Sequence, residues 1–181
     1  MSEVMWTEGV SAPVDAPPVR SVMLALAGFG VLGVCAAVGA PAAGAAAEAI
    51  STSLLVDAGA LVLTAPALLV VHQYLGLAAE PGALIAVLAR AFVTAGGIAL
   101  GVAPCMLVFS ATSGLALAVF VLLLLLVGAA GLRVAWRDLL AAEPAGAQVS
   151  LWKMRGLVLG WAVLASAIGV RIGWDLLPGG L

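Results

Sequence analysis

The residues that could do chemistry in this chain are a few ionisable side chains set within long apolar stretches. The candidates are Asp57, His72, Arg90, Arg171 and Asp175. A charge surrounded by apolar residues is costly, so such groups usually form an ion pair, a proton relay or a polar binding site. Each of the five is therefore a candidate functional residue.

Position along the chain divides the ionisable residues into two groups. His72 follows Asp57 by about 15 residues, which is roughly 22 Å along a helix, so these two side chains cannot share a site. The expected outer group is Glu48, Asp57, Arg171 and Asp175, and the expected inner group is His72, Glu80 and Arg90.

Arg171 is the cation of the outer group, and two acids could pair with it. Asp175 is four residues away on the same helix face, whereas Asp57 belongs to another helix. We expect an Asp57–Arg171 contact, direct or through water. The alternative is that Arg171 extends alone to the outer interface. For Arg90 we expect extension to the inner interface near Glu80, with a role in transport as the alternative.

Motifs of familiar enzyme chemistry are missing from the sequence. It has one His and two Cys, and no His, Cys, Asp or Glu cluster has the spacing of a metal site. No phosphate-binding loop or nucleophile motif follows a strand pattern. No acid stands at the centre of an apolar stretch, as ion-coupled transporters usually require. We therefore expect no cofactor, no bound metal and no enzymatic activity.

The composition determines which solvent could surround such a chain. Of 181 residues, 65% are hydrophobic and 9% are charged, and the net charge is −2. Soluble domains carry about a quarter charged residues, so a soluble enzyme, a nucleic-acid binder and a disordered regulator are excluded. The lipid bilayer is the expected partner.

Gaps between charges locate the membrane spans. No charged residue or His occurs between Arg90 and Arg133, a gap that would make a helix roughly 63 Å long across a core of about 30 Å. The gap must turn once, near 110–114. Lipid leaves backbone groups no partner outside a helix or a barrel, and the apolar runs do not alternate, so we predict an all-α polytopic bundle of about five helices. The spans are about 22–46, 53–75, 84–109, 114–132 and 156–177, behind a disordered tail at 1–20, in a single unit over 21–181.

Basic residues predict the orientation of this bundle. With the amino terminus in the cytoplasm and the carboxyl terminus outside, six of the seven basic residues lie on or near the inner face, as the positive-inside rule requires. Trp136 and Trp152 then flank the inner boundary and Trp174 the outer one. The inner loop 133–155 begins with a continuation of the fourth helix up to Pro144. We expect a bacterial inner membrane protein.

Small residues predict which helices touch, because close backbone approach drives helix association in lipid. Three pairs have the small-xxx-small spacing, namely Gly97 with Gly101, Gly156 with Gly160, and Gly169 with Gly173. We expect the first, third and fifth helices at the centre and the five leucines 122–126 of the fourth facing lipid. The alternative is that the glycines merely reflect base composition. Pro66 and Pro104 interrupt helices as static bends or as hinges.

Two resemblances accompany these patterns. Five spans with an inner amino terminus resemble the Yip-type family, which is linked to membrane trafficking. The segments TAPALLVVHQYLG, APCMLVFSATS and GVRIGWDLLPGG resemble a group of uncharacterised bacterial polytopic proteins. Neither resemblance implies catalytic residues. We expect a non-enzymatic subunit or scaffold that associates with a protein partner or with itself through its helices; the alternative is a small transporter or an oligomeric channel.

Overall fold

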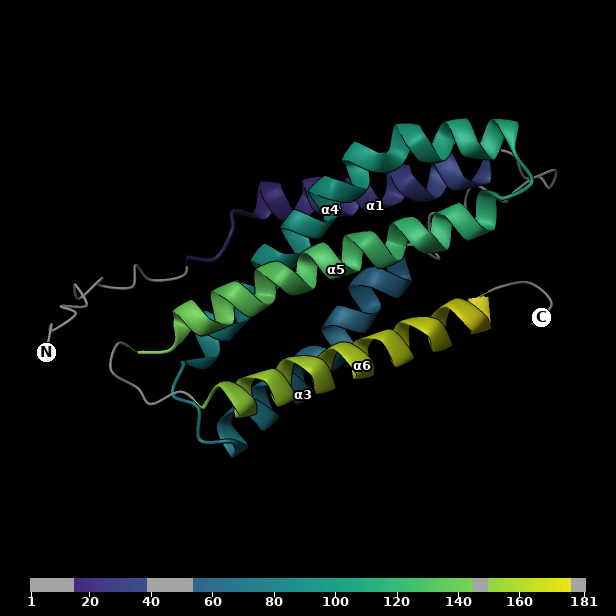
Figure 1. Ribbon diagram of the computed structural model, residues 1–181. Coiled ribbons are helices and arrows are strands. Elements are labelled where there is room, and N and C mark those ends of the chain that lie inside the picture. The colour runs from purple at the N-terminus through teal and green to yellow at the C-terminus, as the bar shows by residue number, and fades with distance from the viewer. Residues whose placement is uncertain (1–14, 39–53, 145–149, 177–181) are drawn as a thin grey trace, which may run out of the picture.

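The computed structural model describes residues 15–38, 54–144 and 150–176, and for Asp57, Leu117 and 173–176 it describes the backbone only. Throughout these residues the chain is helical, with no strand (Figure 1). The helices are α1 Val19–Ala37, α3 Ala60–Tyr74, α4 Pro81–Thr112, α5 Ala116–Ala142 and α6 Leu151–Leu176, and a π-helical turn at Leu55–Gly59 leads directly into α3. The predicted all-α fold is confirmed.

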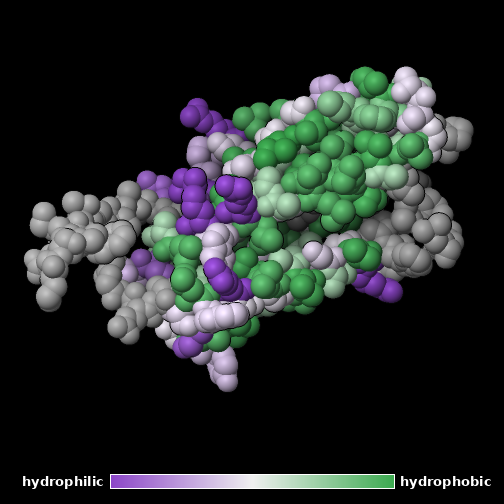
Figure 2. Space-filling model, viewed as in Figure 1, coloured by the Kyte–Doolittle hydropathy of each residue, from purple (hydrophilic) through white to green (hydrophobic). Residues whose placement is uncertain are grey.

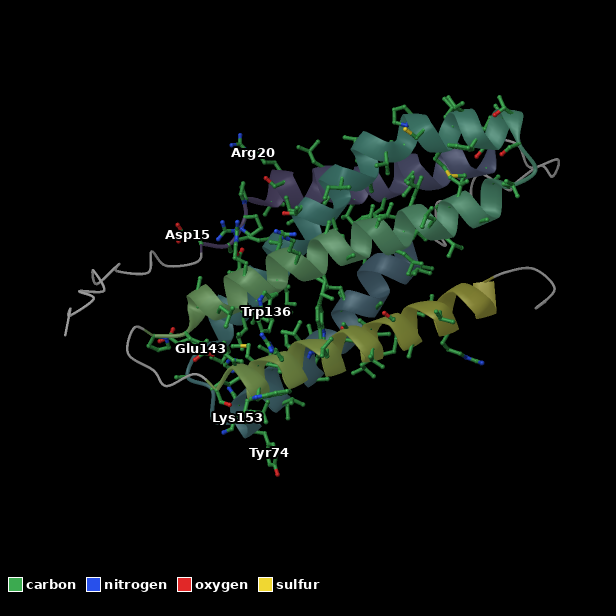
Figure 3. All side chains as sticks on the ribbon, viewed as in Figure 1. Asp15, Arg20, Tyr74, Trp136, Glu143 and Lys153 are labelled. Atoms are coloured by element: carbon green, nitrogen blue, oxygen red, sulfur yellow. The ribbon has the colours of Figure 1, made fainter. Side chains whose placement is uncertain are left out.

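The helices lie side by side and alternate in direction (Figure 1). At one end of the bundle α3 and α5 finish, and α1, α4 and α6 begin. Figure 3 shows Arg20, Trp136, Glu143 and Lys153 toward this end, which we call the basic end. The far end holds the short α4–α5 connection. Arg20 and Lys153, two of the six basic residues that the sequence assigned to one face, therefore lie toward the same end of the bundle.

Within the described residues, four helices are long and apolar enough to cross a membrane, namely α1, α4, α5 and α6. α3 is shorter, with 15 residues, but the π-helical turn extends it without a break. On α5, Leu122, Leu125 and Leu126 are 56%, 66% and 57% exposed, and Figure 2 shows a broad apolar face. A surface of this kind is compatible with an integral membrane protein.

Helix boundaries follow local chemistry. α4 begins at Pro81, where the fixed φ of proline suits the first helical position, with Glu80 extended before it. α5 continues well past the predicted span end at 132 and stops at Ala142, just before Glu143 and Pro144, as the predicted continuation requires. α6 begins at Leu151, earlier than the predicted 156. Residues 39–46 of the first predicted span lie outside the described residues.

The centre of the bundle is α4. It packs against both α1 and α5 over long distances, while α6 packs mainly on α3 and on the π-helical turn. The expectation that the fifth predicted helix is central is therefore wrong, because α6 lies at the periphery. The fourth helix does present leucines outward, but Val127 and Gly131 pack it along α4.

Two apolar cores fill the bundle. Near the basic end one core joins α3, α4, α5 and α6 around Leu84, Leu139 and Met154, all completely buried. Toward the far end the second core joins α1, α4 and α5 around Phe29 and Met106. Ser110 Oγ also donates a hydrogen bond to the carbonyl oxygen of Ala36, 3.3 Å away, and so joins α4 to α1.

The closest approach between helices lies where α1 crosses α4. A Cβ placed on Gly28 would clash with the carbonyl oxygen of Gly96, and one on Gly96 would lie 2.6 Å from the carbonyl oxygen of Ala25. Only glycine permits this backbone contact. By contrast, no atom of the described chain lies within 4 Å of a Cβ built on Gly97 or Gly101. Among the described residues the close contact is made by the neighbouring Gly96, and Gly97 and Gly101 take no part in it.

The other predicted glycine pairs differ from each other. A Cβ on Gly169 would lie 3.4 Å from Val56 Cγ1, so this glycine does seat α6 against the π-helical turn. For its partner Gly173 the structure describes the backbone only, so the predicted role of Gly173 stays a prediction. A Cβ on Gly156 or Gly160 would meet no described atom within 4 Å, so these two do not bring α6 against another helix.

Thr64 lies two residues before Pro66 in α3 and is completely buried. Its hydroxyl donates to the carbonyl oxygen of Ala60 at 2.7 Å and accepts from Trp161 Nε1 at 3.0 Å. The hydroxyl therefore joins α3 to α6. Pro66 is accommodated inside a continuous helix.

Candidate functional site

The polar site of the described chain is built around the buried His72 at the basic end. His72 lies in the last turn of α3, and Glu143 is the C-cap residue directly after α5. The imidazole Nε2 of His72 is 2.8 Å from Oε1 of Glu143, and the two side chains are 0% and 2% exposed. Because a carboxylate can only accept, the hydrogen of this bond is on Nε2 of the imidazole.

Glu143 uses its second oxygen as well. Its Oε2 accepts a hydrogen bond from the backbone N–H of Ala78, at 2.9 Å, in the connection between α3 and α4. One carboxylate thus joins the end of α5, the last turn of α3 and the turn that follows α3. Hydrogen bonds to a charged acceptor are about twice as strong as neutral ones, so this contact fixes three segments together.

His72 Nδ1 is the remaining atom of this contact. It is buried and has no hydrogen-bond partner among the described residues. Histidines that ligate a metal commonly use one nitrogen for the metal and the other for a carboxylate. Across the described chain, however, no group of three or more His, Cys, Asp and Glu side chains could hold a metal ion. What the structure shows for His72 is its contact with Glu143, which joins α3 to the end of α5.

A second polar contact lies one helix away. Asp138 of α5 is 6% exposed at its side chain, and its Oδ1 accepts a hydrogen bond from Arg137 Nε at 3.0 Å. Arg90 of α4 approaches from the facing helix, with Nε 3.6 Å from Asp138 Oδ2. That distance gives an ion pair rather than a hydrogen bond. The Arg90 side chain is 42% exposed, so the pair lies at the surface of the bundle on the arginine side.

A third contact joins α6 to α3. Lys153 Nζ donates a hydrogen bond to the backbone carbonyl oxygen of Leu75, 3.0 Å away, just after the last turn of α3. The final carbonyls of a helix have no partner within the helix and carry partial negative charge. A lysine at this position therefore neutralises the end of α3 while its side chain remains exposed.

The predicted site residues are thus only partly brought together. His72 and Arg90 both lie at the basic end, as expected for the inner group, but Arg90 pairs with Asp138 instead of extending toward Glu80. The reason is that α5 continues as a helix past the expected span and carries Asp138 alongside α4. Arg171 is exposed near the other end of α6. The side chains of Asp57 and Asp175 lie outside the described residues, so the Asp57–Arg171 pair stays a prediction.

Sequence reasoning missed both acids of this site, Asp138 and Glu143. A signal was present for the first one. Arg90 and Asp138 are each about 24 residues from Gly114 in the α4–α5 connection. Two antiparallel helices joined by a short turn place equidistant residues side by side, so this symmetry predicts the pair. No comparable symmetry relates His72 to Glu143.

No family model, curated protein or solved structure matches this chain. Neither resemblance noted from the sequence is supported by these comparisons. What the described part of the chain defines is a class, namely an all-helical bundle with four helices that could span a membrane. The site adds a set of buried ionisable side chains that contact one another at one end of it.

Proposed function

We propose that this chain is a non-enzymatic subunit or scaffold of a bacterial inner membrane, which acts through contacts of its helices with a protein partner or with a second copy. The observation that carries the proposal is the use of the buried ionisable groups. His72 and Glu143 bond to each other, Glu143 also accepts the N–H of Ala78, and Asp138 forms an ion pair with Arg90 of the facing helix. They stabilise a fixed arrangement of helices.

A catalytic or ion-binding carboxylate must reach its substrate. In Glu143 both oxygens are already engaged and the side chain is 2% exposed. Asp138 is nearly as buried and is flanked by two arginines. This arrangement favours a structural role over chemistry, because a substrate would have to displace contacts that hold three segments together.

Two cavities of the described chain also support a scaffold. They have volumes of about 360 and 350 Å³, and both are open to the outside of the bundle. Their linings are apolar except for Lys153 in the first. An ion or polar solute that crosses a membrane needs polar groups along its path. A small transporter or an oligomeric channel would have to build such a path from several copies.

For the orientation we propose that the basic end faces the cytoplasm, with the amino terminus inside and the carboxyl terminus outside. The support is that Arg20 and Lys153 lie toward one end (Figure 3), and that Arg90 and Arg137 both contact Asp138, five residues before Glu143, which lies toward the same end. Cytoplasmic loops and helix ends carry an excess of lysine and arginine.

The test uses the full chain reconstituted in lipid vesicles. Donor- and acceptor-labelled copies should transfer energy at a level that persists when the lipid-to-protein ratio is raised tenfold, if the chain associates with itself. If energy transfer is lost when lipid is added, the chain does not associate with itself. The proposal then requires that cross-linking in native membranes recovers a different protein in stoichiometric amount. Vesicles should hold gradients of protons, sodium, potassium and chloride as long as protein-free vesicles do. A leak that scales with protein content would overturn the scaffold and favour the channel.

A further inference from the structure

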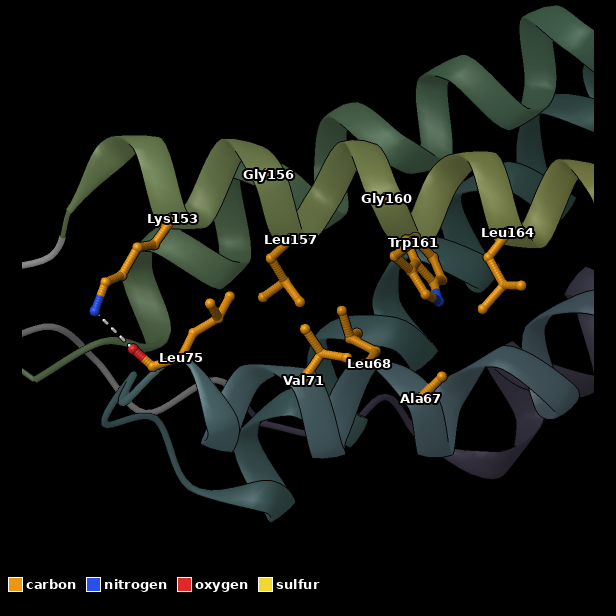
Figure 4. A pocket seen from close by; sticks show the side chains of 10 residues that line it. All are labelled: Ala67, Leu68, Val71, Leu75, Lys153, Gly156, Leu157, Gly160, Trp161 and Leu164. Atoms are coloured by element: carbon orange, nitrogen blue, oxygen red, sulfur yellow. Dashed lines mark hydrogen bonds between the residues drawn. The ribbon is translucent and has the colours of Figure 1, made fainter.

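A groove runs along the outside of the bundle between α3 and α6. It has a volume of about 360 Å³ and is half open. Figure 4 shows Leu68 and Leu75 on one wall, Leu164 at one end and Lys153 at the other. Among the residues that line the groove, Lys153 alone is charged. The groove is therefore lined by apolar residues and has a single cation, Lys153, at one end, which we call its mouth.

The length of the groove corresponds to one leaflet of a bilayer. Its lining on α6 extends from Lys153 to Leu164, which at 1.5 Å per residue is roughly 16 Å. The hydrocarbon core of a bilayer is about 30 Å thick, so half of it is about 15 Å. The groove therefore starts at one surface and ends near the midplane, as an acyl chain of one leaflet does.

Aromatic residues place the mouth of the groove at the membrane surface. Tyr74 at the end of α3 and Trp152 at the start of α6 are 88% and 81% exposed, and Figure 3 shows Tyr74 extending outward close to Lys153. Tyrosine and tryptophan gather at the headgroup level of membranes. Lys153 follows Trp152 in the chain and lies close to Tyr74, which places its ammonium at the level of lipid phosphates if the chain lies in a bilayer.

Lys153 is held in position and keeps capacity for an anion. One donor of its ammonium goes to the carbonyl oxygen of Leu75 at 3.0 Å. An ammonium has three donors, so two remain. The contact holds the cation over the mouth of the groove, where a phosphate oxygen could replace water.

The inside of the groove suits hydrocarbon rather than a polar ligand. Trp161 lines it, but its Nε1–H is already bonded to Thr64 Oγ1 at 3.0 Å. Gly156 and Gly160 line it without side chains, and a Cβ on either would meet no described atom within 4 Å. These two glycines create the open space.

We propose that this groove is a binding site for one anionic phospholipid of the leaflet at the basic end. One acyl chain lies along Gly156 and Gly160, and the phosphate contacts Lys153. The second groove of the chain, between α1, α3 and α4 near Phe92, is similar in volume but is lined by apolar residues without a charge. It therefore lacks the feature that would select an anionic headgroup. The inference rests on the chain lying in a bilayer and goes beyond the scaffold role.

The test is native mass spectrometry of the full chain from mild detergent, with phosphatidylglycerol or phosphatidylcholine added in equal amounts. Wild type should retain phosphatidylglycerol about fivefold better, the preference expected from one lysine near an anionic lipid. Lys153→Gln should remove this preference and Lys153→Arg should keep it. The matched control is Arg155→Gln, which removes an exposed charge two residues away. Equal losses in Lys153→Gln and Arg155→Gln would overturn the proposal, because the attraction would then be non-specific.

A second pair of variants tests the acyl-chain seat. Gly160→Leu fills the groove, whereas Gly97→Leu adds the same side chain at an open position of α4 outside it. Only Gly160→Leu should reduce retention of both lipids. Unchanged retention in Gly160→Leu, or release of the lipid by millimolar glycerol phosphate alone, would overturn the proposal.

The same spectra report a second copy in the groove. If Gly160→Leu abolishes a dimer and leaves lipid retention unchanged, the groove is a contact between copies and the lipid site is disproved. The measurement uses the isolated chain, so it can fail while the scaffold role holds. Conversely, lipid retention can persist when no protein partner is found.

Discussion

His72 and Glu143 form a buried contact of 2.8 Å between the last turn of α3 and the residue that ends α5. The chain between them turns twice and includes the whole of α4 and of α5. The contact therefore joins the end of α3 to the end of the α4–α5 hairpin. Because Glu143 also accepts the N–H of Ala78, its carboxylate is the point at which three segments meet.

Replacing Glu143 should destabilise the bundle. Glu143→Ala leaves the buried His72 Nε2 and the partly exposed N–H of Ala78 without an acceptor; a buried unsatisfied donor costs about 1–3 kcal/mol, and a partly exposed one costs less. We expect a loss of about 2–4 kcal/mol in the free energy of unfolding, measured by titration with SDS in mixed micelles. Glu143→Gln keeps one oxygen and should lose about half as much. The exposed Glu80 is the control, and an equal loss in Glu80→Ala would contradict this account.

The crossing of α1 and α4 should be sensitive at one glycine and insensitive at its neighbour. Gly96→Leu forces a side chain into the backbone of Ala25 and should cost about 3 kcal/mol, the upper end for overpacking. Gly97→Leu adds a side chain in open space and should change the stability by less than about 1 kcal/mol, since leucine is the better helix former. Unfolding in SDS compares the two variants. Similar losses at both positions would show that the crossing does not depend on Gly96.

The Arg90–Asp138 pair should be measurable by a double-mutant cycle. Arg90→Met, Asp138→Asn and the double variant should give a coupling of about 0.5–1 kcal/mol in the free energy of unfolding. The value is small because the Arg90 side chain is 42% exposed and exposed pairs contribute little. The comparison is a cycle of Arg133 with Asp138, for which we expect no coupling. A larger coupling for Arg133 than for Arg90 would be inconsistent with the described geometry.

The proposed orientation can be tested by labelling single cysteines with a membrane-impermeant maleimide. Cys35 and Cys105 are first replaced by serine or alanine. Arg155→Cys lies at the basic end and Thr112→Cys at the far end, and both positions are exposed. In intact cells Thr112→Cys should react and Arg155→Cys should react only after the membrane is opened. The reverse pattern would refute the proposed topology.

The sequence allowed the fold to be predicted because solvent and span length leave few choices. The uncharged run between Arg90 and Arg133 requires a helical hairpin, and α4 and α5 form one. Packing was less predictable, because small residues are frequent in the chain and their spacing does not show which face of a helix is inside. The true crossing uses Gly96, directly beside the predicted Gly97.

The polar site was predicted in part. A buried His72 and an inner Arg90 follow from their place in apolar stretches, but their partners do not. Asp138 and Glu143 lie beyond the expected span end, in the predicted continuation of the fourth helix, for which no packing partner was predicted. The length of α5 beyond the membrane core is set by Pro144 and by packing of Leu139 in the core. That extension brings the two acids back to α3 and α4.

The placement of α6 has a consequence for how the protein is made. α6 leaves the ribosome long after α3 and the turn before it, yet these are the elements on which it mainly packs. Until α6 has been synthesised, the face of α3 that carries Thr64 and Leu68 lacks this partner. That face must therefore be shielded by lipid or by an insertion factor during biogenesis, and a chain truncated before Leu151 would reach the membrane with it uncovered.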